Sequence, residues 1–445
     1  MNKNRPIRTF YIESLGCAKN SVDSRSMAEL LIAAGYREAS QPEKSDLVIV
    51  NTCGFIQPAR EESLQVLRDF AGSKKPGQYL VAAGCLSERE KQQLAREVDG
   101  LDALLGTRRW AEIAAVVERL QQPRQSPYFH FPETDHILED DGGVVRAAVQ
   151  GSSAYLKIAD GCDRLCAFCA IPLIKGPMRS RPLADVLADA AALEAEGVRE
   201  IILIAQDTTT YGRDLGMRDG LTELLRQLIR AVPQVPWIRF MYTFPGMISD
   251  ELIALMAEKN AILPYLDIPL QHAHPQVLQR MRRPNDMEWV RDTLRKIRAA
   301  IPDAALRTTF IVGYPGETEA EFQALLDFTQ EIRFDHVGIF PYYHEADTAA
   351  FGLGDTVPEE LKQERVQRLA ALQEDISLAR NRVWVDRELD VLIEGVGDGI
   401  SAGRSFRDAP EIDGLVLLDQ VLEVGELVRA RVTGALIHDL IARKI

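Results

Sequence analysis

Short apolar runs alternate with longer amphipathic stretches through the first part of the chain. Runs at residues 8–13, 46–50 and 79–83 have the length and composition of buried strands, and each precedes a stretch with helical periodicity. Strands that alternate with helices pack as a parallel sheet covered on both faces. The pattern predicts an α/β fold that opens with a doubly wound parallel domain, which we place at residues 7–122.

The middle of the chain repeats a strand candidate and a helical stretch about every 30 to 40 residues. It follows a segment rich in Pro, Gln and charged residues, which we interpret as a linker at residues 123–147. Six such units predict a partial (β/α) barrel resembling a TIM barrel, with its ligands at the carboxyl ends of the strands. We place it at residues 148–380. The strand candidates are residues 154–158, 200–204, 237–242, 265–269, 306–312 and 336–341.

A different pattern fills the last part of the chain. A long helical stretch covers residues 358–380, and short β-rich runs separated by Gly turns follow at 388–394, 414–418 and 427–433. Such spacing predicts a small antiparallel β-barrel of OB-like type at residues 381–445.

Charge and hydropathy narrow the class of protein. The net charge of −14 argues against broad electrostatic capture of nucleic acid, which needs many Lys and Arg contacts to phosphates. No apolar run approaches the roughly 18 to 20 residues that span a bilayer, and the polar start has no apolar signal core. We therefore expect a cytoplasmic protein with no membrane partner. Its six cysteines are more typical of metal binding or catalysis than of disulfides there.

Three cysteines lie within one short segment, at Cys162, Cys166 and Cys169; we call them the loop cysteines. A structural zinc site normally takes four protein ligands, and no fourth Cys or His lies in this segment. A four-iron cluster held by three thiolates instead leaves one iron open for a small ligand. The spacing favours such a cluster, and zinc or structural thiols remain the alternative.

The other three cysteines, Cys17, Cys53 and Cys85, each adjoin a glycine just after a predicted N-terminal strand; we call them the strand-end cysteines. The carboxyl ends of parallel strands share one edge of the sheet, so these thiols are expected to converge despite their separation. A second cluster with an open iron is favoured over ordinary buried thiols. We also expect the stretches Asn20-Ser21 and Asn51-Thr52-Cys53-Gly54 to cap the helices that follow and to place backbone N–H groups near the sulfurs.

Together these motifs resemble the radical S-adenosylmethionine methylthiotransferase family over nearly the whole chain. The resemblance implies two [4Fe–4S] clusters, an auxiliary one on the strand-end cysteines and a radical-generating one on the loop cysteines. It also implies that S-adenosylmethionine is a cofactor, that the central barrel is a radical SAM core and that the final barrel is a TRAM domain engaging the substrate.

The resemblance further assigns cofactor-binding residues. Phe168 matches the aromatic residue before the third loop cysteine, and Gln206 with Asp207 resembles a polar pair near the methionine amino group. Gly313 to Gly316 resembles a loop against the adenosyl portion. The alternative for that loop is an ordinary β-to-α turn in which Glu317 starts the helix.

For the reaction, the resemblance implies that an electron enters bound S-adenosylmethionine and that the resulting deoxyadenosyl radical takes a hydrogen from a substrate carbon. That carbon then receives a methylated sulfur. Flavodoxin or ferredoxin is a possible electron donor. No acid or base residue is assigned beyond the cluster ligands.

Two branches of the family differ in substrate, one acting on the β-carbon of an aspartate in the small-subunit ribosomal protein S12 and the other on a transfer RNA adenosine. Residues 16–24 and 403–414 resemble the ribosomal-protein branch. Residues 382–445 contain 8 Lys or Arg and 12 Asp or Glu, so this acidic barrel suits a basic protein better than RNA. RNA contact is possible but not favoured. Phe406 and Tyr343 could stack on bases, but isolated aromatic residues on a β-barrel or at a strand end more often pack against the protein.

Several alternatives stay open. The substrate could be transfer RNA, and the protein could be a non-enzymatic iron–sulfur carrier or scaffold. Residues 403–414 could be a solvated acidic turn. Gln271, His272 and His274 are favoured as structural residues at a strand end.

Overall fold

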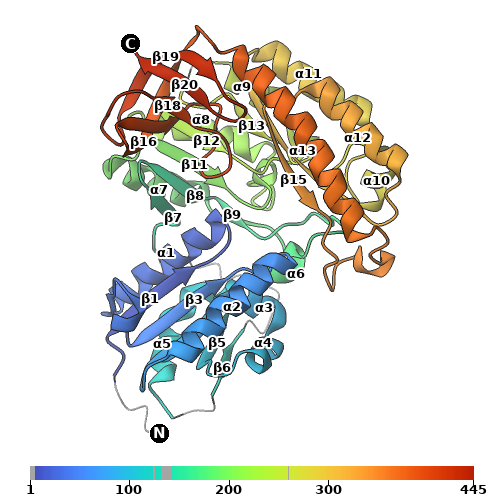
Figure 1. Ribbon diagram of the computed structural model, residues 1–445. Helices are drawn as coiled ribbons and strands as arrows, with labels where there is room; N and C mark the ends of the chain where they lie inside the picture. Colours follow the sequence, from blue (N-terminus) through green and yellow to red (C-terminus); the bar gives the residue numbers. More distant parts are fainter. Residues whose placement is uncertain (1–5, 124–125, 132–142, 259) are drawn as a thin grey trace. The chain divides into compact units, whose positions relative to one another are not determined.

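The computed structural model describes residues 6–123, 126–131, 143–258 and 260–445 (Figure 1). Its contacts divide the chain into two compact units. The first consists of Met1–Ala148, Tyr155–Leu165 and Cys169–Arg179, and the second of Val149–Ala154, Cys166–Phe168 and Ser180–Ile445. Within the described residues no helix is both long and apolar enough to cross a membrane.

The first unit is built on a six-stranded sheet with the order β2-β1-β3-β4-β5-β6, in which every adjacent pair is parallel. The two central strands are buried along their whole length, which explains their unbroken apolar sequences. The strands are β1 (Thr9–Ser14), β2 (Arg37–Glu38), β3 (Leu47–Thr52), β4 (Tyr79–Gly84), β5 (Ala103–Gly106) and β6 (Tyr128–His130).

Helices cover both faces of this sheet. Helix α1 (Ala18–Ala33) and α5 (Ile113–Leu120) pack on one face, and α2 (Gln57–Ser73), α3 (Cys85–Glu90) and α4 (Gln92–Glu97) pack on the other (Figure 1). This confirms the expected doubly wound domain. The sequence pattern missed β5 and β6, and β6 lies in the predicted linker, part of which is outside the described residues.

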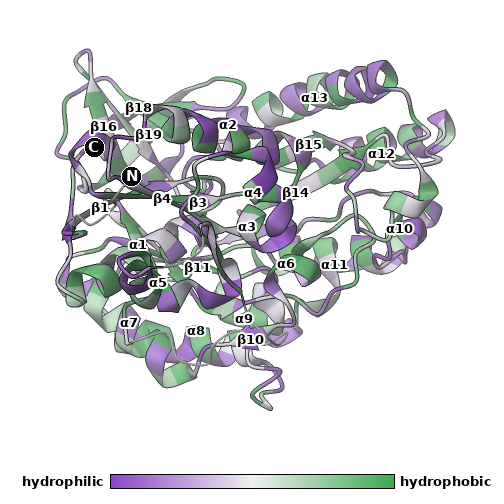
Figure 2. Ribbon diagram, turned by 90° about the horizontal axis from the view of Figure 1, so that it is seen from below, coloured by the Kyte–Doolittle hydropathy of each residue, from purple (hydrophilic) through white to green (hydrophobic). Residues whose placement is uncertain are grey.

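The second unit contains the parallel strands of the central part of the chain. Strand β11 (Glu200–Ile204) pairs with β12 (Trp237–Phe240), and β14 (Ala305–Val312) lies between β13 (Tyr265–Asp267) and β15 (His336–Pro341). Helices such as α8 carry hydrophobic and hydrophilic patches on different sides (Figure 2), and four leucines are among the buried residues of α8. The other helices are α7 (Leu183–Ala195), α8 (Gly220–Ala231), α9 (Asp250–Ala257), α10 (Pro275–Arg280), α11 (Met287–Ala300), α12 (Glu319–Ile332) and α13 (Glu359–Arg382).

Short elements lie where the chain passes between the units: β7 (Ala147–Gln150), β8 (Ser153–Lys157), β9 (Ala159–Asp160), α6 (Ile171–Lys175) and β10 (Arg179–Ser180). They include the segments on either side of the loop cysteines.

The last five strands close into a barrel in the order β16-β17-β18-β20-β19. Its pairs are antiparallel, as expected, except that β18 and β20 run parallel. Apolar side chains such as Val391, Val416 and Val432 fill its centre. The strands are β16 (Glu388–Gly397), β17 (Ile400–Arg404), β18 (Val416–Leu418), β19 (Leu427–Ala435) and β20 (Leu440–Lys444).

Candidate active site

The strand-end cysteines follow three neighbouring strands of the first sheet. Cys17 stands at the N-terminus of α1, Cys53 follows β3, and Cys85 begins α3 directly after β4. The approach is close: a Cβ on Gly16, whose φ is +89°, would lie 2.9 Å from the Cys53 sulfur. Burial raises the pKa of Cys85 to about 12, and the charges of Cys17 and Cys53 act on it in the same direction. The three cysteines therefore lie near one another at this edge of the sheet.

Two asparagines tie these cysteine loops together. The Asn20 amide donates to the carbonyls of Leu15 (2.9 Å) and Thr52 (3.1 Å), and its oxygen accepts from the Cys85 thiol (3.7 Å). The Asn51 amide donates to the Asn20 carbonyl (2.9 Å). The expectation that they cap helices is wrong, because Cys17 and Ile56 hold the cap positions and neither makes a side-chain cap. Buried at the sheet edge, the amides instead satisfy the loop backbone.

The loop cysteines begin in a tightly packed segment. Cys162 is buried, and its sulfur accepts from the Arg164 N–H (3.4 Å). Its own N–H donates to the Gly176 carbonyl (3.1 Å), and a Cβ on Gly161 would lie 2.0 Å from the Pro177 oxygen. Only glycine fits before Cys162, and residues 176–177 form the wall that requires it. Cys166 and Cys169 are half-buried.

A guanidinium group that the sequence did not single out lies at the second loop cysteine. Arg283 donates to the Cys166 sulfur (3.7 Å), and its planar group lies 4.3 Å from the centre of the Phe244 ring. It also donates to the Pro269 carbonyl. Because Arg283 is 117 residues from Cys166, no local spacing could have revealed the contact. A cation here stabilises negative charge on the sulfur.

We expect Arg283→Met to lower the midpoint potential of a cluster held by Cys166, because reduction adds negative charge beside the lost cation. A change on the order of 60 mV corresponds to a tenfold change in a one-electron equilibrium. Redox titration followed by electron paramagnetic resonance measures it, in a chain without the strand-end cysteines. Arg282→Met is the matched control, since Arg282 is exposed. Equal potentials in the two variants would contradict the assignment.

The three side chains expected at the cofactor differ in their surroundings. Phe168 packs beside Tyr314 and Tyr342 in an apolar cluster. Gln206 follows β11, and its side-chain oxygen is buried without a hydrogen-bond partner among the described residues. The Asp207 carboxylate is buried and accepts from the Thr209 N–H (3.1 Å), so it caps a short helical turn. Of this pair, Gln206 is therefore the residue whose side-chain oxygen could accept a hydrogen bond from a ligand.

The loop at residues 313–316 joins β14 to α12. Gly313 has a φ of +74°, and a Cβ there would lie 2.3 Å from the Lys362 side chain, so glycine is required. The Glu317 carboxylate accepts from the N–H groups of Gly313 (2.9 Å) and Tyr314 (3.2 Å). The loop is a β-to-α turn, as the alternative had it, but the helix begins at Glu319 and not at Glu317. Glu317 instead holds the glycine loop in shape. Gly316 has a φ of +75° and open space around it.

Beside this loop lies a fully buried histidine. The His272 Nδ1 accepts from the His274 N–H (3.0 Å), and its Nε2 lies 3.7 Å from the Glu317 carboxylate. Burial lowers the pKa of His272 to about 3 and raises that of Glu317 to about 7, although Arg365 opposes the second shift. His272 is thus neutral at neutral pH.

These two pKa shifts have opposite effects on stability. Between pH 6.5 and 4.5 a proton is held by His272 mainly in the unfolded state and by Glu317 mainly in the folded state. As pH falls through this range, His272 therefore destabilises the fold and Glu317 stabilises it. We expect His272→Gln to remove the first effect. Its stability should then rise on acidification relative to the parent, by about 1.4 kcal/mol per pH unit. Urea unfolding at several pH values in this range measures the stability of the variant and of the parent. His438→Gln is the control, because His438 is exposed. If the stability of His272→Gln changed with pH in parallel with that of the parent, the prediction would be refuted.

Comparison with known proteins identifies the chain's relatives. Three family models match it: the uncharacterized protein family UPF0004 at residues 9–106, the Radical SAM superfamily at 156–329 and the TRAM domain at 385–445. The ribosomal protein uS12 methylthiotransferases RimO of Roseiflexus sp. (strain RS-1) and Chloroflexus aurantiacus are both 47% identical to it. Each alignment covers 97% of this chain, and 96% and 98% of those proteins respectively. This chain belongs to the RimO family.

Membership of the RimO family confirms the resemblance expected from the motifs. The family member of Synechocystis sp. is 42% identical over 97% of this chain and 96% of its own. Among solved structures, the radical S-adenosylmethionine methyltransferase TsrM from Kitasatospora setae has a TM-score of 0.54 at 15% identity, over 75% of this chain and 74% of that chain. At that identity the likeness concerns the fold, and it supports the predicted fold class.

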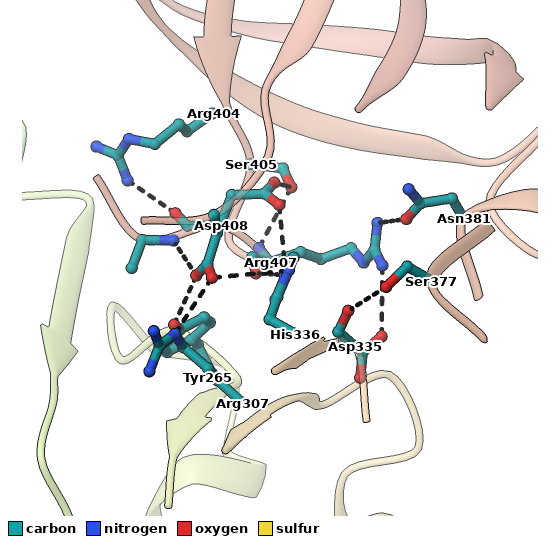
Figure 3. A network of polar contacts seen from close by, with 12 residues as sticks. Tyr265, Arg307, Asp335, His336, Ser377, Asn381, Arg404, Ser405, Arg407 and Asp408 are labelled. Carbon is teal, nitrogen blue, oxygen red and sulfur yellow. Dashed lines mark hydrogen bonds and ion pairs between the residues drawn. The ribbon is translucent and has the colours of Figure 1, made fainter. Parts of the chain in front are cut away.

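Residues 403–414, which favoured the RimO branch, are not a solvated turn (Figure 3). Arg404, Arg407 and Asp408 are buried, and the Asp413 carboxylate accepts from the Tyr265 hydroxyl (2.6 Å). Arg407 lies 3.3 Å from Asp335. The solvated-turn alternative is therefore wrong, because the segment holds the final barrel against β13 and the start of β15. Phe406 packs edge-on against Trp384, as expected of a packing residue.

No three His, Cys, Asp or Glu side chains in the described part of the chain gather closely enough to hold a single metal ion. Around a four-iron cluster each thiolate binds a different iron, so three cysteines stand further apart than around one ion. The donors present, three thiols in each set with no imidazole or carboxylate among them, fit an iron–sulfur cluster by their chemistry.

Proposed function

We propose that this protein is a methylthiotransferase that adds a methylthio group to the β-carbon of an aspartate in ribosomal protein uS12. The observation that carries the proposal is 47% identity to RimO proteins over 97% of the chain. Both three-cysteine sets lie within the matched family models.

We assign the strand-end cysteines to an auxiliary [4Fe–4S] cluster and the loop cysteines to a second one that binds S-adenosylmethionine. When bound, these groups supply the one-electron and sulfur-transfer chemistry. The chain's own residues orient and shield them. Asn20 and Asn51 fix the strand-end loops, Arg283 supports Cys166, and the buried oxygen of Gln206 is available to a ligand amino group.

The domain organisation is part of the proposal: an N-terminal domain at residues 7–122, a linker at 123–147, a radical SAM core at 148–380 and a TRAM domain at 381–445. The excess of acidic residues in that last domain suits a basic ribosomal protein. A substrate in the ribosome also favours a cytoplasmic reaction, with flavodoxin or ferredoxin as electron donor.

Mass spectrometry of a strain without this gene tests the substrate. We expect uS12 to lose the mass of one methylthio group and to regain it when the gene is restored. Loss of a methylthio group from transfer RNA nucleosides alone would overturn the assignment. The carrier alternative makes a separate prediction, because a carrier would form no deoxyadenosine from S-adenosylmethionine and a strong reductant.

A further inference from the structure

Four charged side chains surround the buried Asp23 in the first unit. The Asp23 carboxylate lies 2.6 Å from Arg146, 2.6 Å from Lys157 and 3.0 Å from Lys175. Asp160 lies 2.8 Å from Lys157. Asp23, Arg146, Lys157 and Lys175 are all less than 5% exposed. We call these five residues the Asp23 cluster.

Members of the Asp23 cluster stand beside both sets of cysteines along the chain. Asp23 lies in α1, the helix that begins directly after Cys17. Lys157 and Asp160 shortly precede Cys162, and Lys175 ends α6, which begins shortly after Cys169. One carboxylate therefore connects the helix of a strand-end cysteine to the segments that carry two loop cysteines.

Packing around the cluster supports the same connection. Ile174, next to Lys175, packs with Ala170 against Cys85. The Lys175 ammonium also donates to the Thr107 hydroxyl (2.7 Å), and the Arg108 guanidinium donates to the Ile174 carbonyl (2.9 Å). Residues of the N-terminal domain thus contact α6 in two ways: Thr107 and Arg108 form hydrogen bonds near its C-terminus, and Cys85 packs against its apolar side chain Ile174.

The energetics of burial make this connection rigid. Three cations share two carboxylates. If the Asp23 carboxylate moved away, buried cations would be left without a counter-charge and without water to solvate them. The three cations together outweigh burial and hold the pKa of Asp23 far below its usual range. Buried polar networks of this kind rigidify the parts of the fold that they connect.

We propose that Asp23 is a positioning residue that sets the spacing between the two cysteine sites. The inference rests on the proposed function, because methylthio transfer requires the sulfur held at one site to reach the carbon activated at the other. A displacement of about 1 Å can cost a hundredfold in rate when two reacting groups must meet. Forming deoxyadenosine needs only one of the sites, so it should tolerate the change.

The experiment uses anaerobically reconstituted full-length protein. Asp23→Asn unbalances the buried charges, so a second variant combines Asp23→Asn with Lys175→Met and keeps the net charge of the cluster unchanged. The control is Asp102→Asn. Asp102 is also buried in the first unit, but it pairs with Lys74 (2.9 Å) and the Leu80 N–H (2.9 Å), at the opposite end of β4 from Cys85. It reports the general cost of losing a buried carboxylate.

Three quantities are measured: iron and sulfide per chain, the magnetic dipolar interaction between the reduced clusters, and the ratio of deoxyadenosine to methylthiolated uS12 peptide. We expect the double variant to hold both clusters, to show an altered dipolar interaction and to raise the ratio about tenfold or more. The control should match the parent in all three.

The outcomes separate the two proposals. If the double variant keeps the parent's dipolar interaction and ratio, Asp23 contributes stability alone and the inference fails. If the parent itself makes deoxyadenosine but no methylthiolated peptide, the proposed function fails, while the dipolar measurement still tests the spacing. If Asp102→Asn raises the ratio as much as the double variant does, spacing is not the cause and the inference is also overturned.

Discussion

Replacing Cys162, Cys166 and Cys169 by alanine is expected to abolish deoxyadenosine formation and to remove about four iron atoms per chain. The reason is that, in the proposed assignment, these three thiolates would hold a cluster with one iron left open to S-adenosylmethionine. Iron and sulfide analysis with electron paramagnetic resonance measures the loss of one cluster, and chromatography of the reaction mixture measures deoxyadenosine.

The matched variant replaces Cys17, Cys53 and Cys85 by alanine. We expect the same loss of iron, but here deoxyadenosine continues to form while methylthiolation of a uS12 peptide stops. The two triple variants thus control for each other, because each removes three thiols. Zinc in the parent protein, or full iron content in either variant, would refute the assignment of two clusters.

Much of the fold followed from local patterns. Buried parallel strands need unbroken apolar runs, and strand β11 was found at the predicted residues 200–204. The convergence of the strand-end cysteines was also predictable, because the order of strands and helices implies a parallel sheet whose carboxyl ends share an edge. Positions along the chain were sufficient there.

Contacts between distant side chains were beyond the reach of such patterns. Arg283 lies 117 residues from Cys166, and Lys175 lies 152 residues from Asp23. Nothing in the local sequence distinguishes these cations from solvated ones. Asn20 and Asn51 misled for a related reason: asparagine after a strand is typical of a helix cap, but buried carbonyls from neighbouring loops competed successfully for their amides.

The same limit applies to residues 403–414, for which the charges left a solvated turn open as an alternative. Their buried partners come from the central barrel. Glu200 at the start of β11 accepts from Arg239 (2.8 Å) and from Arg404 of the final barrel, and all three are at most 1% exposed. This trio is the most deeply buried ionic contact between the central and final barrels that the described residues contain.

We expect Glu200→Gln to destabilise the protein by about 3 to 5 kcal/mol, because two buried guanidinium groups would lose their shared carboxylate. Thermal unfolding should move to lower temperature, and limited proteolysis should cut first near the junction at residues 381–385. The loss should be smaller when Arg404→Met accompanies Glu200→Gln, since one of the orphaned cations is then removed as well.

The pH dependence offers an independent check on the same carboxylate. Although burial opposes ionisation, Arg239 and Arg404 lower the pKa of Glu200 to about 2. Its stabilisation is therefore complete above the unfolded value near 4.5 and is lost as pH falls toward 2. Glu200→Gln should unfold with a shallower pH dependence between pH 4.5 and 3.

An exposed pair in the final barrel provides the control. Glu388 lies 2.8 Å from Arg431, but both side chains are open to solvent. Water and salt screen such a pair, so Glu388→Gln should leave the unfolding temperature and the proteolysis pattern almost unchanged. If both substitutions proved equally mild, the Glu200 network would not be what holds the final barrel. Apolar contacts such as Trp384 against Phe406 would then have to explain its attachment.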